Sequence, residues 1–154
     1  MKEKGDFRLQ EIPIFFSTDD QYIPYLDVAI SSLIDHASTA YQYRIVVLNT
    51  GLSPEGVAKI QKNERPGFSI DFVDISDELK DIQSKLKNVY HFSIVTYYRL
   101  FIASLFPQYG KVIYLDCDLV VRKNLYSANG RRTRSEVYAR FKVLVGPPAL
   151  KGLF

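Results

Sequence analysis

With 154 residues, 47% of them hydrophobic, the chain is long enough to bury one globular core and too apolar for a disordered protein. The formal net charge of +3 is concentrated in residues 127–154, which hold six basic side chains and one acidic side chain, so residues 1–126 are mildly acidic. That distribution argues against nucleic-acid binding as the main function, because a nucleic-acid-binding domain spreads basic residues over a folded face.

The first half of the chain alternates strand and helix patterns. Residues 12–17 form an apolar run that is typical of a strand. Pro24 suits the first turn of a helix whose apolar side chains recur at spacings of three and four residues. Residues 43–49 predict a second strand, and Ser53 followed by a proline predicts an N-capped helix over residues 54–63.

The same alternation continues toward residue 126. Residues 68–73 predict a third strand, and Ser76 opens a short helix. Residues 93–106 predict a further helix that ends before Pro107, and residues 112–115 form a short buried strand. Strands that alternate with helices imply crossover connections, so the expected fold class is α/β, with a largely parallel sheet flanked by helices.

Residues 127–154 do not continue this pattern. Their first part is basic and turn-like, and residues 137–145 are compatible with either a strand or a helix before a Gly-Pro-Pro turn. We therefore expect two regions, a folded domain over residues 1–126 and a basic tail over residues 127–154. A frameshift or a truncation after Leu125 would explain the abrupt change in composition.

Two carboxylates follow the fourth predicted strand. In an extended chain Asp116 and Asp118 point to one side, and Cys117 points to the other. Open α/β sheets bind ligands at the carboxyl ends of their strands, and two carboxylates there favour Mg²⁺ or Mn²⁺ shared with phosphates and water. A solvated acidic turn is the alternative. The lone thiol of Cys117 is expected to pack as a small apolar side chain.

Further polar side chains are expected at the same edge of the sheet. Asp19 and Asp20 follow the first strand, and a carboxylate such as Asp19 can accept a hydrogen bond from a base N–H. Arg99 can neutralise phosphate oxygens with its planar guanidinium group. Together with Asp116 and Asp118, these residues describe a nucleotide-diphosphate site. The alternatives are helix N-capping by the first acidic pair and a surface or ion-paired role for the arginine.

Three segments resemble glycosyltransferase family 8, which includes bacterial lipopolysaccharide galactosyl- and glucosyltransferases and glycogenin. The segments are IPIFFSTDDQYIPYLDVAISSLIDHAS at residues 12–38, YRIVVLNTGLS at residues 43–53 and SIVTYYRLFIASLFPQYGKVIYLDCDLVV at residues 93–121. The T-Y-Y-R-L and Y-L-D-x-D sequences are the most specific part. The resemblance implies a truncated GT-A fold that binds a nucleotide-diphospho-sugar, UDP-glucose or UDP-galactose. It also implies transfer of the hexose, with retention of configuration, to a glycan, lipid-linked or protein acceptor.

The resemblance assigns the metal and the diphosphate to particular residues. Asp116 and Asp118 match the D-x-D that binds Mn²⁺ or Mg²⁺, and Arg99 matches an arginine near the donor diphosphate and sugar. In the family a histidine far downstream completes the metal site, and the groups that approach the anomeric carbon also come later. This chain has only His36 and His91, both upstream. Its catalytic residues therefore stay unknown, and the activity of the chain itself is an open question.

The resemblance also places three residues near the rest of the donor. Asp19 matches an acidic residue near the uracil, and Gln21 falls at a position that is often polar and binds the donor. His91 matches a polar position close to the donor, and a local hydrogen bond before the following helix explains it equally well. Three neighbours of Arg99 are expected to pack their helix rather than to touch sugar, namely Tyr97, Tyr98 and Leu100.

Two alternatives to an active transferase remain. The first is a truncated nucleotide-sugar-binding domain that binds donor and metal without efficient transfer. The second is a phosphatase of the haloacid dehalogenase type, in which the first Asp of a D-x-D is a nucleophile, but too little chain follows Asp118 for its other catalytic segments. The single cysteine and the polar amino terminus predict a cytoplasmic setting, including the inner face of the membrane. The apolar runs are too short for a transmembrane segment.

Overall fold

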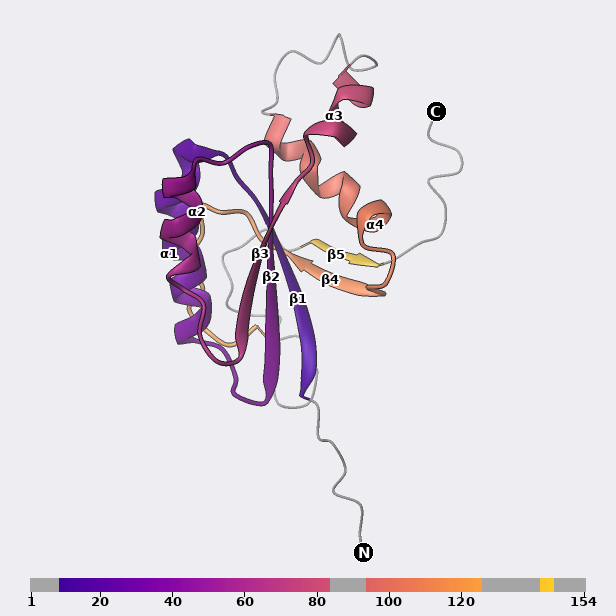
Figure 1. Cartoon of the computed structure of the whole chain (residues 1–154). Coiled ribbons are helices and arrows are strands. Elements are labelled where there is room, and N and C mark those ends of the chain that lie inside the picture. Colours follow the sequence, from indigo (N-terminus) through magenta and orange to yellow (C-terminus); the bar gives the residue numbers. More distant parts are fainter. Residues whose placement is uncertain (1–8, 84–93, 126–141, 146–154) are drawn as a thin grey trace, which may run out of the picture.

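The computed structural model describes residues 9–83, 94–125 and 142–145, which form a sheet with helices on both faces (Figure 1). The strands are β1 (Gln10–Ser17), β2 (Tyr41–Asn49), β3 (Phe68–Asp74), β4 (Lys111–Tyr114) and β5 (Lys142–Val145). The α-helices are α1 (Ile23–Asp35), α2 (Pro54–Gln61), α3 (Ser76–Gln83) and α4 (Ile102–Leu105), and the 3-10 helices are η1 (Asp20–Tyr22) and η2 (Ile94–Phe101). The four predicted strands and the first three predicted helices are confirmed.

The sheet is largely parallel, as the alternation of elements predicts. Its strand order is β3-β2-β1-β4-β5, and every pair of neighbours is parallel except β4 with β5. The register aligns Ser17 with Leu48 and Asn49 with Asp74, so β1, β2 and β3 end at nearly the same level. The loops that leave these strands therefore begin along one edge of the sheet.

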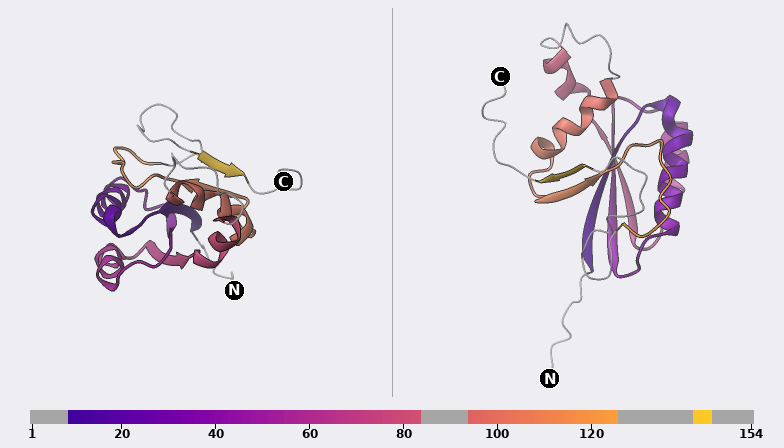
Figure 2. Two further views of the ribbon diagram at one scale, coloured as in Figure 1. Left: turned by 90° about the horizontal axis from the view of Figure 1, so that it is seen from above. Right: turned by 180° about the vertical axis from the view of Figure 1, so that it is seen from behind.

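Side-chain alternation divides the core into two layers. Ile14 and Phe16 of β1 pack on the side of α1, whereas Phe15 packs on the opposite side with the buried residues of η2 and α4. Figure 2 shows α1 and α2 along one face and α3, η2 and α4 over the other. Leu26 and Leu33 of α1 are fully buried, as their spacing predicts, and burying one such side chain stabilises the fold by about 1.5–3 kcal/mol.

The segment predicted as a helix over residues 93–106 is mostly a 3-10 helix rather than an α-helix. Residues 94–101 form the 3-10 helix η2, and only residues 102–105 are α-helical. The segment begins with β-branched residues and continues with aromatic ones, which lose rotamer freedom in an α-helix and lower its advantage over a tighter turn. Ser93, the first residue of the predicted helix, lies outside the described residues.

The chain beyond β4 follows two courses. After Asp118 it runs along α1, where the Val121 N–H donates to the Ser32 hydroxyl at 2.9 Å and Leu125 is buried in the α1-side layer. Residues 142–145 form β5, antiparallel to β4, which decides between the strand and the helix that the sequence allows there. These four residues of the predicted tail thus add an antiparallel strand beside β4.

Candidate functional site

The carboxyl ends of the parallel strands form a continuous edge held by backbone hydrogen bonds. The Thr18 N–H donates to the Leu48 carbonyl at 3.1 Å, and the Ile75 N–H donates to the Asn49 carbonyl at 2.9 Å. Beyond β4, the Leu115 N–H donates to the carbonyl of Phe15 in β1 at 2.9 Å. The turns after β1, β2, β3 and β4 thus begin along the same edge of the sheet, where open α/β sheets bind ligands.

Asp19 caps the short helix after β1. Its Oδ1 accepts hydrogen bonds from the backbone N–H of Gln21 at 3.0 Å and of Tyr22 at 3.2 Å. The N-capping interpretation is therefore confirmed for Asp19. Both bonds use Oδ1, so this turn makes no use of the second carboxylate oxygen. The side chain of Gln21 is exposed beside it.

Asp20 has a structural role that the sequence did not indicate. Its carboxylate accepts from the Ser53 N–H at 3.0 Å and from the Ser53 hydroxyl at 2.9 Å. The same hydroxyl accepts from the Gly56 N–H at 3.1 Å, which confirms Ser53 as the N-cap of α2. A Cβ at Gly56 would lie 2.8 Å from Asp20 Oδ1, so the glycine permits this close approach. Asp20 ties the turn after β1 to the turn after β2.

Arg99 lies over the last residue of β4. Its guanidinium carbon is 5.7 Å from the ring centroid of Tyr114, a cation–π distance. Burial raises the pKa of Tyr114, the Asp116 carboxylate raises it further, and the Arg99 charge opposes both effects. The Ser17 hydroxyl also lies close enough to Tyr114 to oppose the rise, although no hydrogen bond of good geometry joins them. Arg99 in η2 and Asp116, which follows β4, therefore act on the pKa of the same tyrosine.

Tyr98 connects η2 to the first two turns. Its hydroxyl lies 2.8 Å from the Thr50 hydroxyl, and only 1% of the residue is exposed. Burial raises the pKa of Tyr98, and the nearby carboxylates of Asp19 and Asp74 raise it further, while the bond to Thr50 lowers it. The packing role predicted for Tyr98 is confirmed, whereas the one predicted for Leu100 is wrong, because Leu100 is exposed. The side chain of Tyr97 lies outside the described residues. The sequence analysis did not predict the contact with Thr50. Thr50 follows β2, so the rule that the carboxyl ends of parallel strands share one edge could have placed it near the candidate site.

Asp116 and Asp118 follow β4 as predicted, but the strand alternation does not reach them. The strand ends at Tyr114, and Cys117 and Asp118 lie in a turn, so that turn sets the direction of the carboxylates. Asp116 is half-buried and Asp118 is exposed. Cys117 is buried with the α1-side layer, as predicted. Burial, reinforced by Asp118 and Asp116, raises its pKa to about 11, so the thiol stays protonated at neutral pH.

The donor set of the D-x-D fits a hard cation only in part. Among the described residues, no group of three His, Cys, Asp or Glu side chains could hold a metal ion. Two carboxylates without a third protein ligand suit Mg²⁺ or Mn²⁺ when phosphates and water fill the remaining positions. His36 caps the far end of α1, where its Nδ1 lies 2.9 Å from the Ser32 carbonyl oxygen. His91 lies outside the described residues.

Comparison with known proteins identifies the family. Residues 13–128 match the model of glycosyl transferase family 8. The chain belongs to this family. It is 30% identical over 112 residues to the glycosyltransferase GlyD of Streptococcus pneumoniae. The aligned region covers 73% of this chain and 13% of GlyD.

Solved structures of glycosyltransferases share the fold. The apo structure of the bifunctional glycosyltransferase WbbM matches with a TM-score of 0.61 and 32% identity, over 75% of this chain and 20% of that one. The galactosyltransferase LgtC, solved in complex with donor and acceptor sugar analogs, matches with a TM-score of 0.57 and 33% identity, over 74% of this chain and 40% of that one. The predicted GT-A fold is confirmed. The chain spans well under half the length of each of these three relatives.

Proposed function

We propose that this chain is the nucleotide-sugar-binding part of a retaining, metal-dependent hexosyltransferase. The observation that carries the proposal is a set of unpaired charges at one edge of the sheet. Within the described ranges, Arg99, Asp116 and Asp118 form no ion pair with one another or with any other side chain. Opposite charges that converge on Tyr114 without pairing suit a ligand that carries both a metal ion and phosphates.

Each residue has a distinct part in this proposal. Asp116 and Asp118 hold Mn²⁺ or Mg²⁺, which when bound neutralises the charge of the donor diphosphate. Arg99 binds diphosphate oxygens through its planar guanidinium group. Asp19 uses its second carboxylate oxygen to accept from the base of a uridine nucleotide, and Gln21 contributes a polar contact beside it. His91 is a further donor contact in the same proposal.

The proposed sugar and acceptor rest on the resemblance to the family alone. We propose UDP-glucose or UDP-galactose as the donor and a glycan, a lipid-linked molecule or a protein as the acceptor. LgtC, whose solved complex contains donor and acceptor sugar analogs, supports this class of ligands. We propose a cytoplasmic site of action, including the inner face of the membrane. In the described part of the chain, no helix is long and apolar enough to span a membrane.

A binding domain without efficient transfer is the second candidate. It is favoured by the incomplete metal site, since the described residues supply two carboxylates and no third ligand. Transfer also requires an acceptor held in register with the donor, and losing one side of a site removes that positioning even where binding survives. Release of UDP from UDP-glucose or UDP-galactose, compared with a longer family member, separates the two candidates. The phosphatase alternative has no support from the family.

Substitution of Asp118 by asparagine tests the proposed function. We expect Asp118→Asn to weaken Mn²⁺-dependent UDP binding by roughly 100-fold, because the side chain loses its charge at the metal. The fold should be unchanged, since Asp118 is exposed. Asp77→Asn is the matched control, because it removes the same charge from an exposed position in α3, paired with Lys80. Calorimetric titration with equal UDP affinity in wild type and Asp118→Asn would refute the metal role.

A further inference from the structure

The 3-10 helix η2 carries Arg99 and has little internal support. Its hydrogen-bond geometry is poorer than that of an α-helix, so runs of this length depend on tertiary contacts. Tyr98 supplies such a contact, because its ring is buried in the layer that holds Phe15 and Leu48. Its hydroxyl reaches Thr50, which is exposed at the edge of the sheet. The hydrogen bond therefore runs from the core to the rim of the candidate site.

The turn that presents Thr50 is itself held in place. Asn49 is buried, and its Nδ2 donates to the Val47 carbonyl at 3.3 Å and to the Val73 carbonyl at 3.2 Å. Its Oδ1 accepts from the Gly51 N–H at 3.0 Å, and Gly51 has a φ of 95°, a conformation that favours glycine. Thr50 lies between these two anchored residues. The hydroxyl that meets Tyr98 is thus fixed to the sheet.

We propose that the Thr50–Tyr98 hydroxyl pair positions Arg99 for the donor diphosphate, an inference that rests on the function proposed above. Arg99 directly follows Tyr98, and in a 3-10 helix each side chain is rotated by a third of a turn from the previous one. Fixing Tyr98 therefore fixes the direction in which Arg99 leaves η2. The guanidinium group of Arg99 in turn lies over the ring of Tyr114. Tyr98 and Thr50 are positioning residues, and they bind no ligand in this proposal.

Deleting the tyrosine hydroxyl tests the inference. Tyr98→Phe keeps the buried ring and removes the bond to Thr50, and we expect UDP affinity in the presence of Mn²⁺ to fall about fivefold, the effect of one hydrogen bond. Thr50→Val should give the same loss of UDP affinity, and Thr50→Ser should retain the wild-type affinity because serine keeps the hydroxyl. In an Arg99→Ala background, Tyr98→Phe should change the affinity by less than about twofold, because its effect passes through the arginine. Calorimetry well below the unfolding temperature separates these changes from stability.

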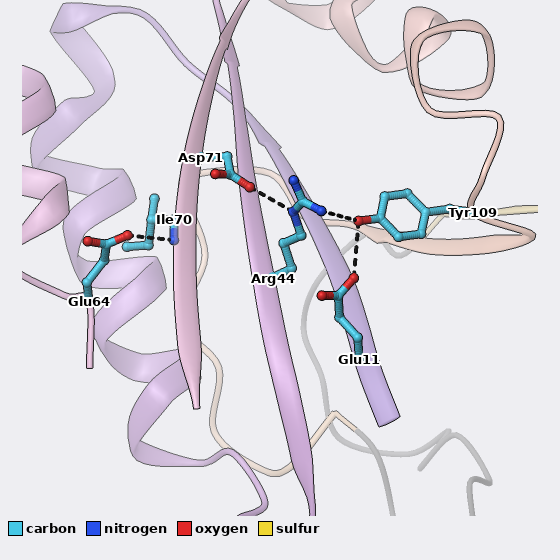
Figure 3. A network of polar contacts seen from close by, with 6 residues as sticks. All are labelled: Glu11, Arg44, Glu64, Ile70, Asp71 and Tyr109. Carbon is cyan, nitrogen blue, oxygen red and sulfur yellow. Dashed lines mark hydrogen bonds and ion pairs between the residues drawn. The ribbon is translucent and has the colours of Figure 1, made fainter. Parts of the chain in front are cut away.

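Tyr109→Phe is the matched control. Like Tyr98→Phe, it deletes a tyrosine hydroxyl. This hydroxyl accepts from Arg44 at 3.1 Å and donates to Glu11 at 3.2 Å, in a network near the beginnings of the strands (Figure 3). We expect it to lower stability and to leave UDP affinity unchanged.

Three outcomes would overturn the inference. Unchanged affinity in Tyr98→Phe, together with a clear loss in Arg99→Ala, would refute the positioning role and leave the proposed function intact. An equal loss from Tyr98→Phe with and without Arg99 would show that the hydroxyl acts on the fold in general. Absence of Mn²⁺-dependent UDP binding in the wild-type chain would refute the proposed function itself, and the inference with it.

Discussion

Two polar clusters on the same face of the sheet differ in whether their charges are paired. The strand-start cluster consists of Glu11, Arg44, Asp71 and Tyr109 (Figure 3). Arg44 Nε donates to Asp71 Oδ2 at 2.7 Å and Arg44 Nη1 donates to the Tyr109 hydroxyl, so two nitrogens of its guanidinium group have partners within the fold. The carboxylate and the arginine are both partly exposed, and such pairs add little to stability.

The carboxyl-edge cluster consists of Thr50, Tyr98, Arg99, Tyr114 and Asp116. Here the tyrosines carry the contacts within the fold, through the Thr50 hydroxyl and the guanidinium group of Arg99. The arginine and the carboxylate lie near the same ring without forming an ion pair among the described residues. The comparison shows that an arginine beside a tyrosine is a candidate ligand-binding group only where the fold leaves its charge unmatched.

Substituting the two arginines by lysine would break or support this comparison. Arg99→Lys should weaken Mn²⁺-dependent UDP binding about 30-fold, because charged hydrogen bonds from a planar fork are lost and a point charge remains. Arg44→Lys should leave UDP affinity unchanged and lower stability slightly. Calorimetric titration and urea unfolding of both variants measure these effects. If both substitutions weakened UDP binding alike, the distinction between the clusters would be wrong.

The contact between Asp20 and Ser53 joins the turns after β1 and β2, and Gly56 lies directly against it. Gly56→Ala should destabilise the fold by about 1–2 kcal/mol, because the added methyl group is forced against the Asp20 carboxylate. In an Asp20→Ala background, the same substitution should cost much less, since alanine favours a helix over glycine by up to about 1 kcal/mol. Urea unfolding of the four proteins measures the coupling. Equal costs in the two backgrounds would show that the clash lies with Ser53 or Ile23 instead, the other atoms near that Cβ.

The elements that periodicity determines were predictable from the sequence. The apolar spacing of α1 and the alternation of the strands arise from local geometry, so the layers of the fold follow from them. The common edge of Asp19 and Asp116 follows in turn from the parallel sheet. These predictions needed no knowledge of which side chains meet.

Contacts between distant segments were not predictable in the same way. Tyr98 and Thr50 are far apart in the sequence, and nothing in either segment names the other. The hydrogen bond between Asp20 and Ser53 was not predictable either. An acidic residue before a helix is already explained locally as an N-cap, so nothing in the sequence indicates a distant partner. The 3-10 form of η2 was also unpredictable, because tertiary packing such as that of the buried Tyr98 ring decides the local structure where propensities are weak.

The smallest expected difference between the two clusters is in how the stability of the fold changes at alkaline pH. Burial raises the pKa of both Tyr98 and Tyr109 above the ordinary value of 10.0. At Tyr98 the bond to Thr50 opposes the rise and nearby carboxylates reinforce it, whereas at Tyr109 Arg44 opposes it and Glu11 reinforces it. Tyr98 is the more deeply buried of the two residues. A tyrosine with a raised pKa in the folded state loses its proton first in the unfolded chain. Its contribution to stability is therefore complete below about pH 10 and is lost as the pH rises through the folded-state value.

We accordingly expect the free energy of unfolding to fall above pH 10, and Tyr98→Phe to reduce that fall more than Tyr109→Phe does. Urea unfolding of the wild type and the two variants at several pH values between 8 and 11 measures the slopes. Comparing slopes removes the pH-independent cost of each lost hydroxyl. A larger reduction for Tyr109→Phe would mean that Arg44 does not offset burial, and the strand-start cluster could then no longer be regarded as the electrostatically satisfied one.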